Sequence, residues 1–189
     1  MSAQMWLSLF AIRDSGRPDR PPGLYGAAFV DYQDGSVLTY HELVVARLLR
    51  DGRIPRVRVT DIWVDSPESV AGGRSLWAFP KELAHLPLRD GRLGPASRTT
   101  FSGVAEGQHL ASGTFTSLPG AALVRTPFAS TTSQQREDGS TVEASLSGSG
   151  RGLPCVGKWR FDADGPLGFL HGRRPLLSLR VVDVRLRVA

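Results

Sequence analysis

The stretch "SPESVAGGRSLWAFPKELA" (residues 66–84) places a lysine directly after a proline and behind an apolar run. The chain contains only two lysines, Lys81 and Lys158, against 21 arginines. Arginine keeps its proton near neutral pH, whereas a desolvated lysine can lose its proton and then act as a nucleophile. A genome rich in GC also favours arginine codons, so this asymmetry marks Lys81 as a candidate but does not assign its role.

Length and composition fit one globular domain over residues 1–189, since 41% of the residues are hydrophobic. No run approaches the roughly 18 apolar residues that would span a membrane, and the first residues show no signal-peptide pattern. A single cysteine, Cys155, excludes an internal disulfide framework and fits a reducing cytoplasm. The net charge of +5 comes from arginines scattered along alternating strands. We therefore expect a cytoplasmic protein that binds neither nucleic acid nor membrane.

Short runs rich in β-branched and apolar residues, separated by glycine, proline or aspartate, dominate the chain. Asp34-Gly35 between two of them predicts a hairpin. The predicted strands are Met5–Arg13, Gly26–Tyr32, Val37–Val45, Arg56–Val64, Leu110–Ser117, Thr141–Ser147 and Leu176–Val188. Many short strands without crossover helices indicate a mainly β fold, an antiparallel sandwich or barrel.

Helix signals are few. Ser66–Ala71 has a cap residue and a first-turn proline, and short turns of helix are predicted at Lys81–Leu86 and Pro166–His171. Residues 14–23 ("DSGRPDRPPG") and 145–154 ("SLSGSGRGLP") are predicted to be flexible, because glycine, proline and serine dominate them.

Several kinds of chemistry lack the residues they need. The four histidines show no metal-ligand spacing, no G-x-S-x-G elbow occurs, and nucleotide-binding fingerprints are absent, so we expect no metal and no cofactor. The apolar neighbours of Lys81, among them Trp77 and Phe79, predict that burial lowers the pKa of its ammonium. The alternative is a surface lysine whose stem covers Trp77.

The strand "VLTYHELVV" (residues 37–45) carries the second candidate. Tyr40 and Glu42 share one face and His41 points the other way. A carboxylate among apolar residues is costly to bury without a partner. The alternation fits neither register well, so Glu42 could equally lie on the wet outer face.

These segments together resemble the acetoacetate decarboxylase superfamily. Residues 66–84 are similar to that family's A-G-R-E-x-x-G-F-P-K-K-L segment, and "TYHE" (39–42) is similar to its Y-x-E strand. The order and spacing of the two motifs agree, and "GKWRFDADGPLGFLHGRRPLLSL" (157–179) adds support. The chain is identified as a divergent, short member, of an actinobacterial type.

The resemblance implies a closed, cone-like antiparallel β-barrel with a few short helices and an apolar cavity, and an oligomeric assembly of identical chains. It implies that Lys81 forms a Schiff base with a keto acid or related carbonyl compound, with Glu42 as acid/base or orienting group. The expected substrate-binding residues are Tyr40, Arg74, Trp77, Phe79 and Glu82. We expect a cavity of several hundred cubic ångströms, lined by Trp77, Phe79, Tyr40 and the strand near residues 26–30.

The chain also departs from the family pattern. Glu82 stands where the family has a second lysine, and the stretches "QMWLSLFA" (4–11) and "GAAFV" (26–30) lack the family's arginine and acidic residue. Three functions therefore remain open. They are a Schiff-base lyase of natural-product metabolism acting by decarboxylation or aldol and dehydration chemistry, a non-covalent cyclase that folds a polyketide-like intermediate, and a non-catalytic barrel that binds a small molecule.

Overall fold

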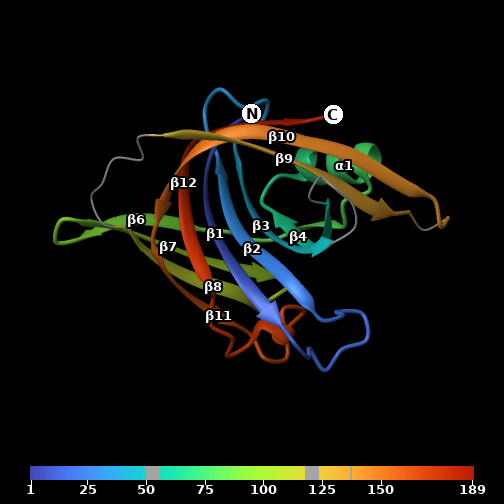
Figure 1. Cartoon of the computed structure of the whole chain (residues 1–189), viewed down its shortest axis with the longest axis horizontal. Helices are drawn as coiled ribbons and strands as arrows, with labels where there is room; N and C mark the ends of the chain where they lie inside the picture. Colours follow the sequence, from blue (N-terminus) through green and yellow to red (C-terminus); the bar gives the residue numbers. More distant parts are fainter. Residues whose placement is uncertain (50–55, 118–123, 137) are drawn as a thin grey trace.

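The computed structural model describes residues 1–49, 56–117, 124–136 and 138–189, and it is built mostly of strands (Figure 1). Its elements in chain order are β1 (Ser2–Ile12), β2 (Gly23–Tyr32), β3 (Tyr40–Leu49), β4 (Arg56–Val64), α1 (Pro67–Trp77), β5 (Lys81–Leu83), β6 (Leu88–Leu93), β7 (Ala96–Ala105), β8 (Gln108–Ser117), β9 (Arg125–Gln135), β10 (Thr141–Pro154), β11 (Val156–Phe161), the 3₁₀ turn η1 (Gly168–Leu170) and β12 (Leu177–Val188).

Seven strands close into a barrel in the order β3-β2-β1-β12-β10-β9-β4, and β4 then pairs with β3. Among the described pairings of this ring, all are antiparallel except the short contact between β4 and β9. Closure gives both edge strands of the sheet a neighbour, although β9 meets β4 at only two residue pairs, Arg56 with Thr131 and Val57 with Thr132. The prediction of a mainly β chain forming a closed barrel is confirmed, and so is the hairpin, since β2 and β3 pair on either side of Asp34-Gly35.

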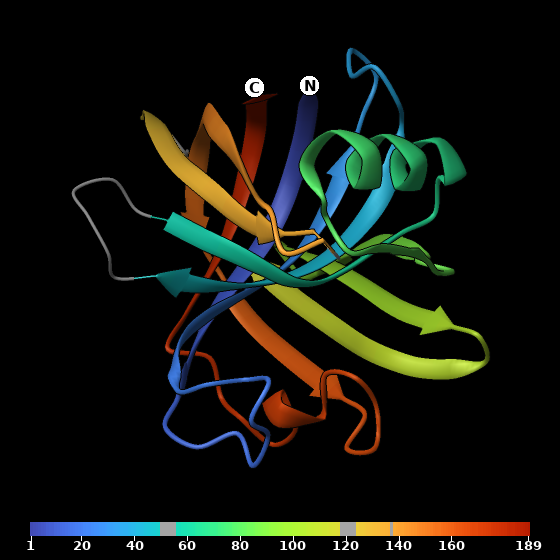
Figure 2. The ribbon, with the colours of Figure 1, turned by 90° about the vertical axis from the view of Figure 1, so that its right-hand side faces the viewer.

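A second sheet, in the order β11-β8-β7-β6, packs outside the barrel (Figures 1 and 2). The largest apolar cluster unites the outer faces of β1, β2 and β3, through residues such as Trp6, Phe29 and Leu43, with Phe101 and Phe115 of the second sheet. The opposite faces of β1 and β2 point into the barrel. Because apolar side chains cover β3 on both sides, apolar and polar residues do not alternate regularly along it. The sequence alone therefore does not show which face of β3 carries Glu42.

Inside the barrel the side chains are mainly apolar. The cluster there consists of Ala3, Ala28, Val30, Tyr32 and Val184, with partly buried Met1, Met5, Leu7, Tyr40, Val44, Phe128, Val181 and Leu186 around it. Helix α1 lies against β5 and also touches β4 and β10 (Figure 2).

Two local predictions are wrong. Residues 81–86 do not form a helical turn, because Ala78 adopts a left-handed conformation that ends α1, and the chain after Pro80 pairs with β4 as strand β5. Residues 145–154 are not flexible, because they belong to β10, where Gly148 allows the backbone of β12 to approach closely. A Cβ at Gly148 would collide with the Arg185 carbonyl oxygen and with the Phe128 ring.

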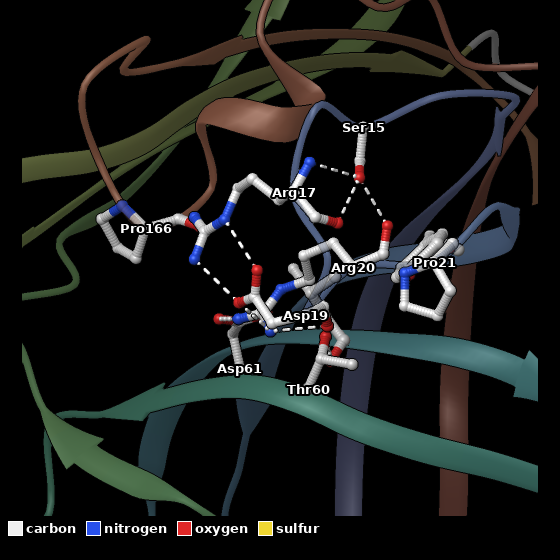
Figure 3. Close-up of polar contacts among 10 residues, drawn as sticks. Ser15, Arg17, Asp19, Arg20, Pro21, Thr60, Asp61 and Pro166 are labelled. Carbon is white, nitrogen blue, oxygen red and sulfur yellow. Dashed lines mark hydrogen bonds and ion pairs between the residues drawn. The ribbon is translucent and has the colours of Figure 1, made fainter.

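The loop between β1 and β2, also predicted to be flexible, is held by polar contacts (Figure 3). The Ser15 hydroxyl donates to the Arg17 and Arg20 carbonyl oxygens, at 2.9 and 2.5 Å. Arg17 and Arg20 both pair with Asp19, and Arg20 Nη2 also pairs with the buried Asp61 on β4 at 2.6 Å. Side-chain partners thus replace the regular hydrogen bonds that this glycine- and proline-rich loop lacks.

Candidate functional site

Lys81 is buried inside the barrel at the start of β5. Ile62 of β4 is its register partner, and only 5% of the lysine is exposed to solvent. Glu82, the next residue, points the opposite way, as alternation along a strand requires. The surface-lysine alternative for Lys81 is therefore wrong.

Two polar side chains hold the Lys81 ammonium. Its Nζ donates to Glu42 Oε2 at 3.0 Å and to Ser69 Oγ at 2.9 Å, and all three residues are buried. Nζ also lies 5.3 Å from the centroid of the Tyr40 ring, within cation–π range. Glu42 and Tyr40 thus reach the lysine from β3, and Ser69 reaches it from α1.

The capping of α1 explains how Ser69 is placed. Ser66 is the N-cap, and its hydroxyl accepts a hydrogen bond from the Ser69 backbone N–H at 3.2 Å, while Pro67 occupies the first turn. At the other end, the N–H groups of Ala78 and Phe79 donate to the carbonyl oxygens of the last helical turn. The chain then turns back so that Lys81 lies under the helix.

Gly73 is the point where α1 touches the lysine stem. Ser69 and Gly73 are four residues apart, so they share one helical face, and both are buried. A Cβ at Gly73 would lie 2.6 Å from Lys81 Cδ and 2.8 Å from Cε, which is a steric clash. At Gly72 a Cβ would meet nothing within 4 Å. Gly73 is therefore required by close packing, whereas Gly72 is not.

Two stacked tyrosines complete the polar centre. The Tyr32 and Tyr40 rings lie 4.4 Å apart at 21°, and the Tyr32 hydroxyl makes a long contact of 3.5 Å with Glu42 Oε1. Burial, together with the neighbouring carboxylate of Glu42, raises the pKa of both phenols, that of Tyr32 well above its usual value. Both tyrosines therefore stay protonated and can donate hydrogen bonds.

The expected pKa of Lys81 is corrected by this geometry. Burial is the largest single influence and lowers the pKa of the ammonium, but the Glu42 carboxylate and Tyr40 together outweigh it, and the net pKa of Lys81 lies above its usual value. At rest the site therefore holds an ammonium–carboxylate pair.

Glu82 and Arg74, both expected to bind substrate, lie outside this centre. Glu82 Oε2 accepts a hydrogen bond from the Trp63 indole N–H at 3.0 Å, on the outer side of the strand. Arg74 Nε donates to the Lys81 carbonyl oxygen at 2.7 Å, so Arg74 positions the backbone of β5. Trp77 and Phe79 contact each other with centroids 6.0 Å apart, and Phe79 packs in the barrel wall.

His41 anchors the strand that carries Glu42. Its backbone N–H donates to Asp65 Oδ1 at 2.6 Å, and its Nδ1 lies 2.8 Å from Asp65 Oδ2. Asp65 directly precedes the cap residue of α1, so this pair ties β3 to the start of the helix. The hydrogen bond with Asp65 raises the pKa of His41 above its usual value.

Charge is scarce in the described interior. Among the residues that the structure describes, the buried charged side chains are Glu42, Asp61 and Lys81, and Asp61 is paired with Arg20 of the β1–β2 loop. The strands that would carry the family's arginine and acidic residue present Met5, Leu7, Ala28 and Val30 to the interior instead.

Two hollows are described on the molecule. One of about 450 Å³ lies beside Met1 and Gly148, and one of about 820 Å³ lies beside Leu24 and Arg47. Lys81 lines neither of them, so the expected cavity around Trp77, Phe79 and Tyr40 is not one of these two and stays a prediction.

Comparison with known proteins identifies the family. The family described as acetoacetate decarboxylase (ADC) matches residues 17–142, two thirds of the chain. The chain belongs to the acetoacetate decarboxylase family. The matched range includes Glu42, Ser69 and Lys81. No curated protein sequence matches the chain significantly.

Solved structures of similar proteins share this fold. An acetoacetate decarboxylase structure superposes with a TM-score of 0.66 at 14% identity, covering 100% of this chain and 87% of the other. The acetoacetate decarboxylase of Legionella pneumophila subsp. pneumophila str. Philadelphia 1 gives 0.62 at 13% identity, covering 99% and 85%. The enduracididine biosynthesis enzyme MppR, complexed with pyruvate, gives 0.63 at 17% identity, covering 98% and 88%.

Two further features are absent from the described residues. No group of three or more histidine, cysteine, aspartate or glutamate side chains that could hold a metal occurs in the described parts of the chain. Among the helices of those same parts, none has the length and apolar character needed to cross a membrane.

Proposed function

We propose that this protein is a Schiff-base enzyme in which Lys81 attacks the carbonyl group of a small-molecule substrate inside the barrel. The observation that carries the proposal is the buried contact between Lys81 Nζ and Glu42 Oε2 at 3.0 Å. A nucleophilic lysine needs a base that removes its proton, and Glu42 is within hydrogen-bond reach for that transfer.

The reaction begins when Glu42 takes a proton from the Lys81 ammonium. The neutral amine attacks the carbonyl carbon and forms a C–N bond, and the carbonyl oxygen is protonated and leaves as water. The imine nitrogen keeps one positive charge and stays paired with Glu42. When a C–C bond next to the imine breaks, its electron pair moves to this nitrogen and gives an enamine, which is then protonated and hydrolysed to release Lys81.

The charge balance of the interior favours an uncharged carbonyl substrate. The protonated imine and Glu42 cancel each other, so a ketone or aldehyde leaves the site neutral. A substrate carboxylate would add a second negative charge, with no further buried cation among the described residues to hold it. An unpaired buried charge costs several kcal/mol. Aldol-type cleavage or condensation, or dehydration, therefore fits this site better than decarboxylation.

Relatives with the same fold support this choice of chemistry. One structure of MppR holds the condensation product of pyruvate and imidazole 4-carboxaldehyde, at 16% identity to this chain. A protein of this fold therefore binds a compound made by condensation of a keto acid with an aldehyde.

The decisive experiment is reductive trapping. The protein is incubated with cyanoborohydride and either an uncharged ketone, such as 2-nonanone, or a keto acid, such as acetoacetate, and the modified lysine is located by peptide mass mapping. We expect irreversible mass at Lys81, with the ketone labelling faster than the keto acid. Lys158, exposed on β11, reports the background reactivity of a solvated lysine.

Three variants sharpen the trapping experiment. Lys81→Arg keeps the charge but cannot form an imine, so labelling at residue 81 should vanish. Glu42→Gln removes the base and should slow labelling at least tenfold, whereas Lys158→Arg should leave labelling at Lys81 unchanged. Labelling at Lys81 no faster than at Lys158 would refute the covalent mechanism.

A non-covalent cyclase is the second candidate, and the raised pKa of Lys81 favours it. An ammonium held by Glu42 and Ser69, beside the protonated Tyr32 and Tyr40, can donate hydrogen bonds to a folded intermediate without attacking it. Turnover of a polyketide-like substrate by Lys81→Arg protein would favour the cyclase. Binding of the same compound without turnover in the wild type would favour a non-catalytic barrel.

A further inference from the structure

Two arginines face each other across neighbouring strands at the end of the barrel where β3 and β4 are joined. Arg47 of β3 and Arg58 of β4 are register partners, and like charges in directly opposite positions destabilise a sheet. Neither forms an ion pair with any carboxylate in the described parts of the chain. Arg47 Nη2 donates to the Pro22 carbonyl oxygen at 2.9 Å, while its buried Nε has no described partner.

The nearby loop shows how this chain treats other arginines at the same end. Arg17 and Arg20 are both paired with Asp19, and Arg20 also with Asp61 (Figure 3). Those positive charges are neutralised within the protein, whereas the pair formed by Arg47 and Arg58 leaves two uncompensated charges side by side. An anion from outside the described residues would remove that repulsion.

These arginines border the hollow of about 820 Å³. Its other walls are mostly apolar and include Leu24, Leu48, Leu49 and Leu176, the last of which is 67% exposed. The volume falls in the range of pockets that hold small organic ligands. Apolar walls with two guanidinium groups at the side match one chemistry, an acyl chain that ends in a carboxylate.

We propose that this hollow binds an apolar carboxylate of medium chain length, with its anionic end between Arg47 and Arg58. The site is separate from the Lys81 centre, since Leu48 and Glu42 are six residues apart on β3, about 20 Å at the rise of a strand. Leu48 belongs to the same alternating set of β3 as Glu42, whereas Arg47 belongs to the opposite set, so the hollow takes in both faces of β3 at this end of the barrel. The carboxylate is therefore either the far end of a long Lys81 substrate that reaches past this end of the strand or a second ligand.

The first test is direct binding of decanoate, measured by isothermal titration calorimetry against the full-length chain. We expect decanoate to bind at least tenfold more tightly than 1-decanol, and its affinity to fall as salt is added. Arg47→Gln and Arg58→Gln should each weaken decanoate at least tenfold and leave 1-decanol unchanged. Arg160→Gln, an exposed arginine on β11 with no described ion pair, is the matched control.

A second variant guards against a trivial loss of folding. Leu24→Trp fills the hollow without touching charge, and it should weaken decanoate and 1-decanol alike while the thermal unfolding midpoint changes little. The proposal is overturned if decanoate does not bind. It is also overturned if decanoate and 1-decanol bind equally well and both arginine variants keep the wild-type affinity for decanoate.

A competition experiment distinguishes a carboxylate that belongs to the Lys81 substrate from one that belongs to a separate ligand. Decanoate is added to the ketone-trapping reaction at Lys81, and its binding is also measured in Lys81→Arg protein, which keeps a positive charge beside Glu42. Slower labelling identifies the hollow as the far end of the substrate path, whereas unchanged labelling identifies a separate ligand. Decanoate binding by the Lys81→Arg protein keeps this site independent of whether the Schiff-base proposal holds.

Discussion

Replacing Gly73 by alanine tests the close packing between α1 and the lysine stem. The added Cβ would lie 2.6 Å from Lys81 Cδ and 2.8 Å from Cε. Carbon atoms in contact are normally separated by about 3.5–4.0 Å, so helix and side chain must separate by about 1 Å. Lys81 cannot move that far freely, because its Nζ is held at 3.0 Å by Glu42 and at 2.9 Å by Ser69.

The size of the effect follows from two opposing terms. A helical Gly→Ala change gains about 0.5–1 kcal/mol of stability through backbone entropy. Overpacking costs about 1–3 kcal/mol. Gly73→Ala should therefore lower the free energy of unfolding by about 1–2 kcal/mol. At Gly72 the added Cβ meets nothing within 4 Å, so Gly72→Ala should raise the free energy of unfolding by the helical gain of about 0.5–1 kcal/mol. The two variants should differ by about 2 kcal/mol in free energy of unfolding.

Urea unfolding measures that difference, and cyanoborohydride trapping measures whether Lys81 keeps its place. We expect Gly73→Ala to label Lys81 more slowly than wild type, because a shift of 1 Å breaks at least one hydrogen bond to Nζ. Gly72→Ala should label at the wild-type rate. Equal stability of the two alanine variants, with equal labelling, would show that α1 does not constrain Lys81.

Three further changes follow from the same geometry. Ala78→Gly should stabilise the protein by about 1 kcal/mol in urea unfolding, because Ala78 has a left-handed backbone with φ of 53°; a loss of stability would contradict this. The stability that His41 gains from Asp65 is fully present below about pH 6.5 and is lost as the pH rises through the raised pKa of His41. His41→Gln should therefore cost more stability at pH 5.5 than at pH 8.5, and an equal cost at both would exclude this linkage. Lys81→Met should lower the free energy of unfolding by about 3–5 kcal/mol at pH 7, because it leaves the buried Glu42 carboxylate without its partner. The double variant with Glu42→Leu should recover most of that loss. If the two single losses simply add in urea unfolding, Lys81 and Glu42 are not coupled.

Alternation and turn chemistry were enough to predict seven of the twelve strands in the described parts of the chain. Five strands escaped them, among them β5, which the sequence predicts as a helical turn. β9 reads as a polar segment with a proline, "RTPFASTTSQQ", because its polar side chains satisfy backbone groups within the barrel wall. The side-chain amide of Gln134 exchanges two hydrogen bonds with the Val59 backbone, at 2.9 and 3.0 Å. Such pairing depends on which strand becomes the neighbour, and a local pattern does not contain that information. The same holds for β6, β7 and β11.

The candidate site was predicted in part. Lys81 and Glu42 stand out in sequence, because a lysine among apolar residues and a carboxylate in an apolar strand both demand an explanation. Ser69 and Tyr32 were missed. Ser69 reads as one more polar residue in the first turn of a helix, and Tyr32 reads as the end of an apolar strand. Only the packing of α1 over β5, and of β2 against β3, brings them to the ammonium and the carboxylate.

The sign of the Lys81 pKa shift shows what sequence neighbours leave out. Trp77 and Phe79 predict a lowered pKa through burial, and burial does act in that direction. Glu42, 39 residues away in the chain, reverses the outcome together with Tyr40, because β3 carries both to Lys81 and places Glu42 Oε2 3.0 Å from Nζ. The amine is therefore not stored in its reactive form. In the mechanism that we propose, a substrate carbonyl that enters between the two groups weakens their contact, and proton transfer to Glu42 then releases the neutral amine where the carbonyl carbon lies. If this is the route, labelling of Lys81 should rise with pH, and Glu42→Gln should slow labelling by a smaller factor at high pH than at pH 7.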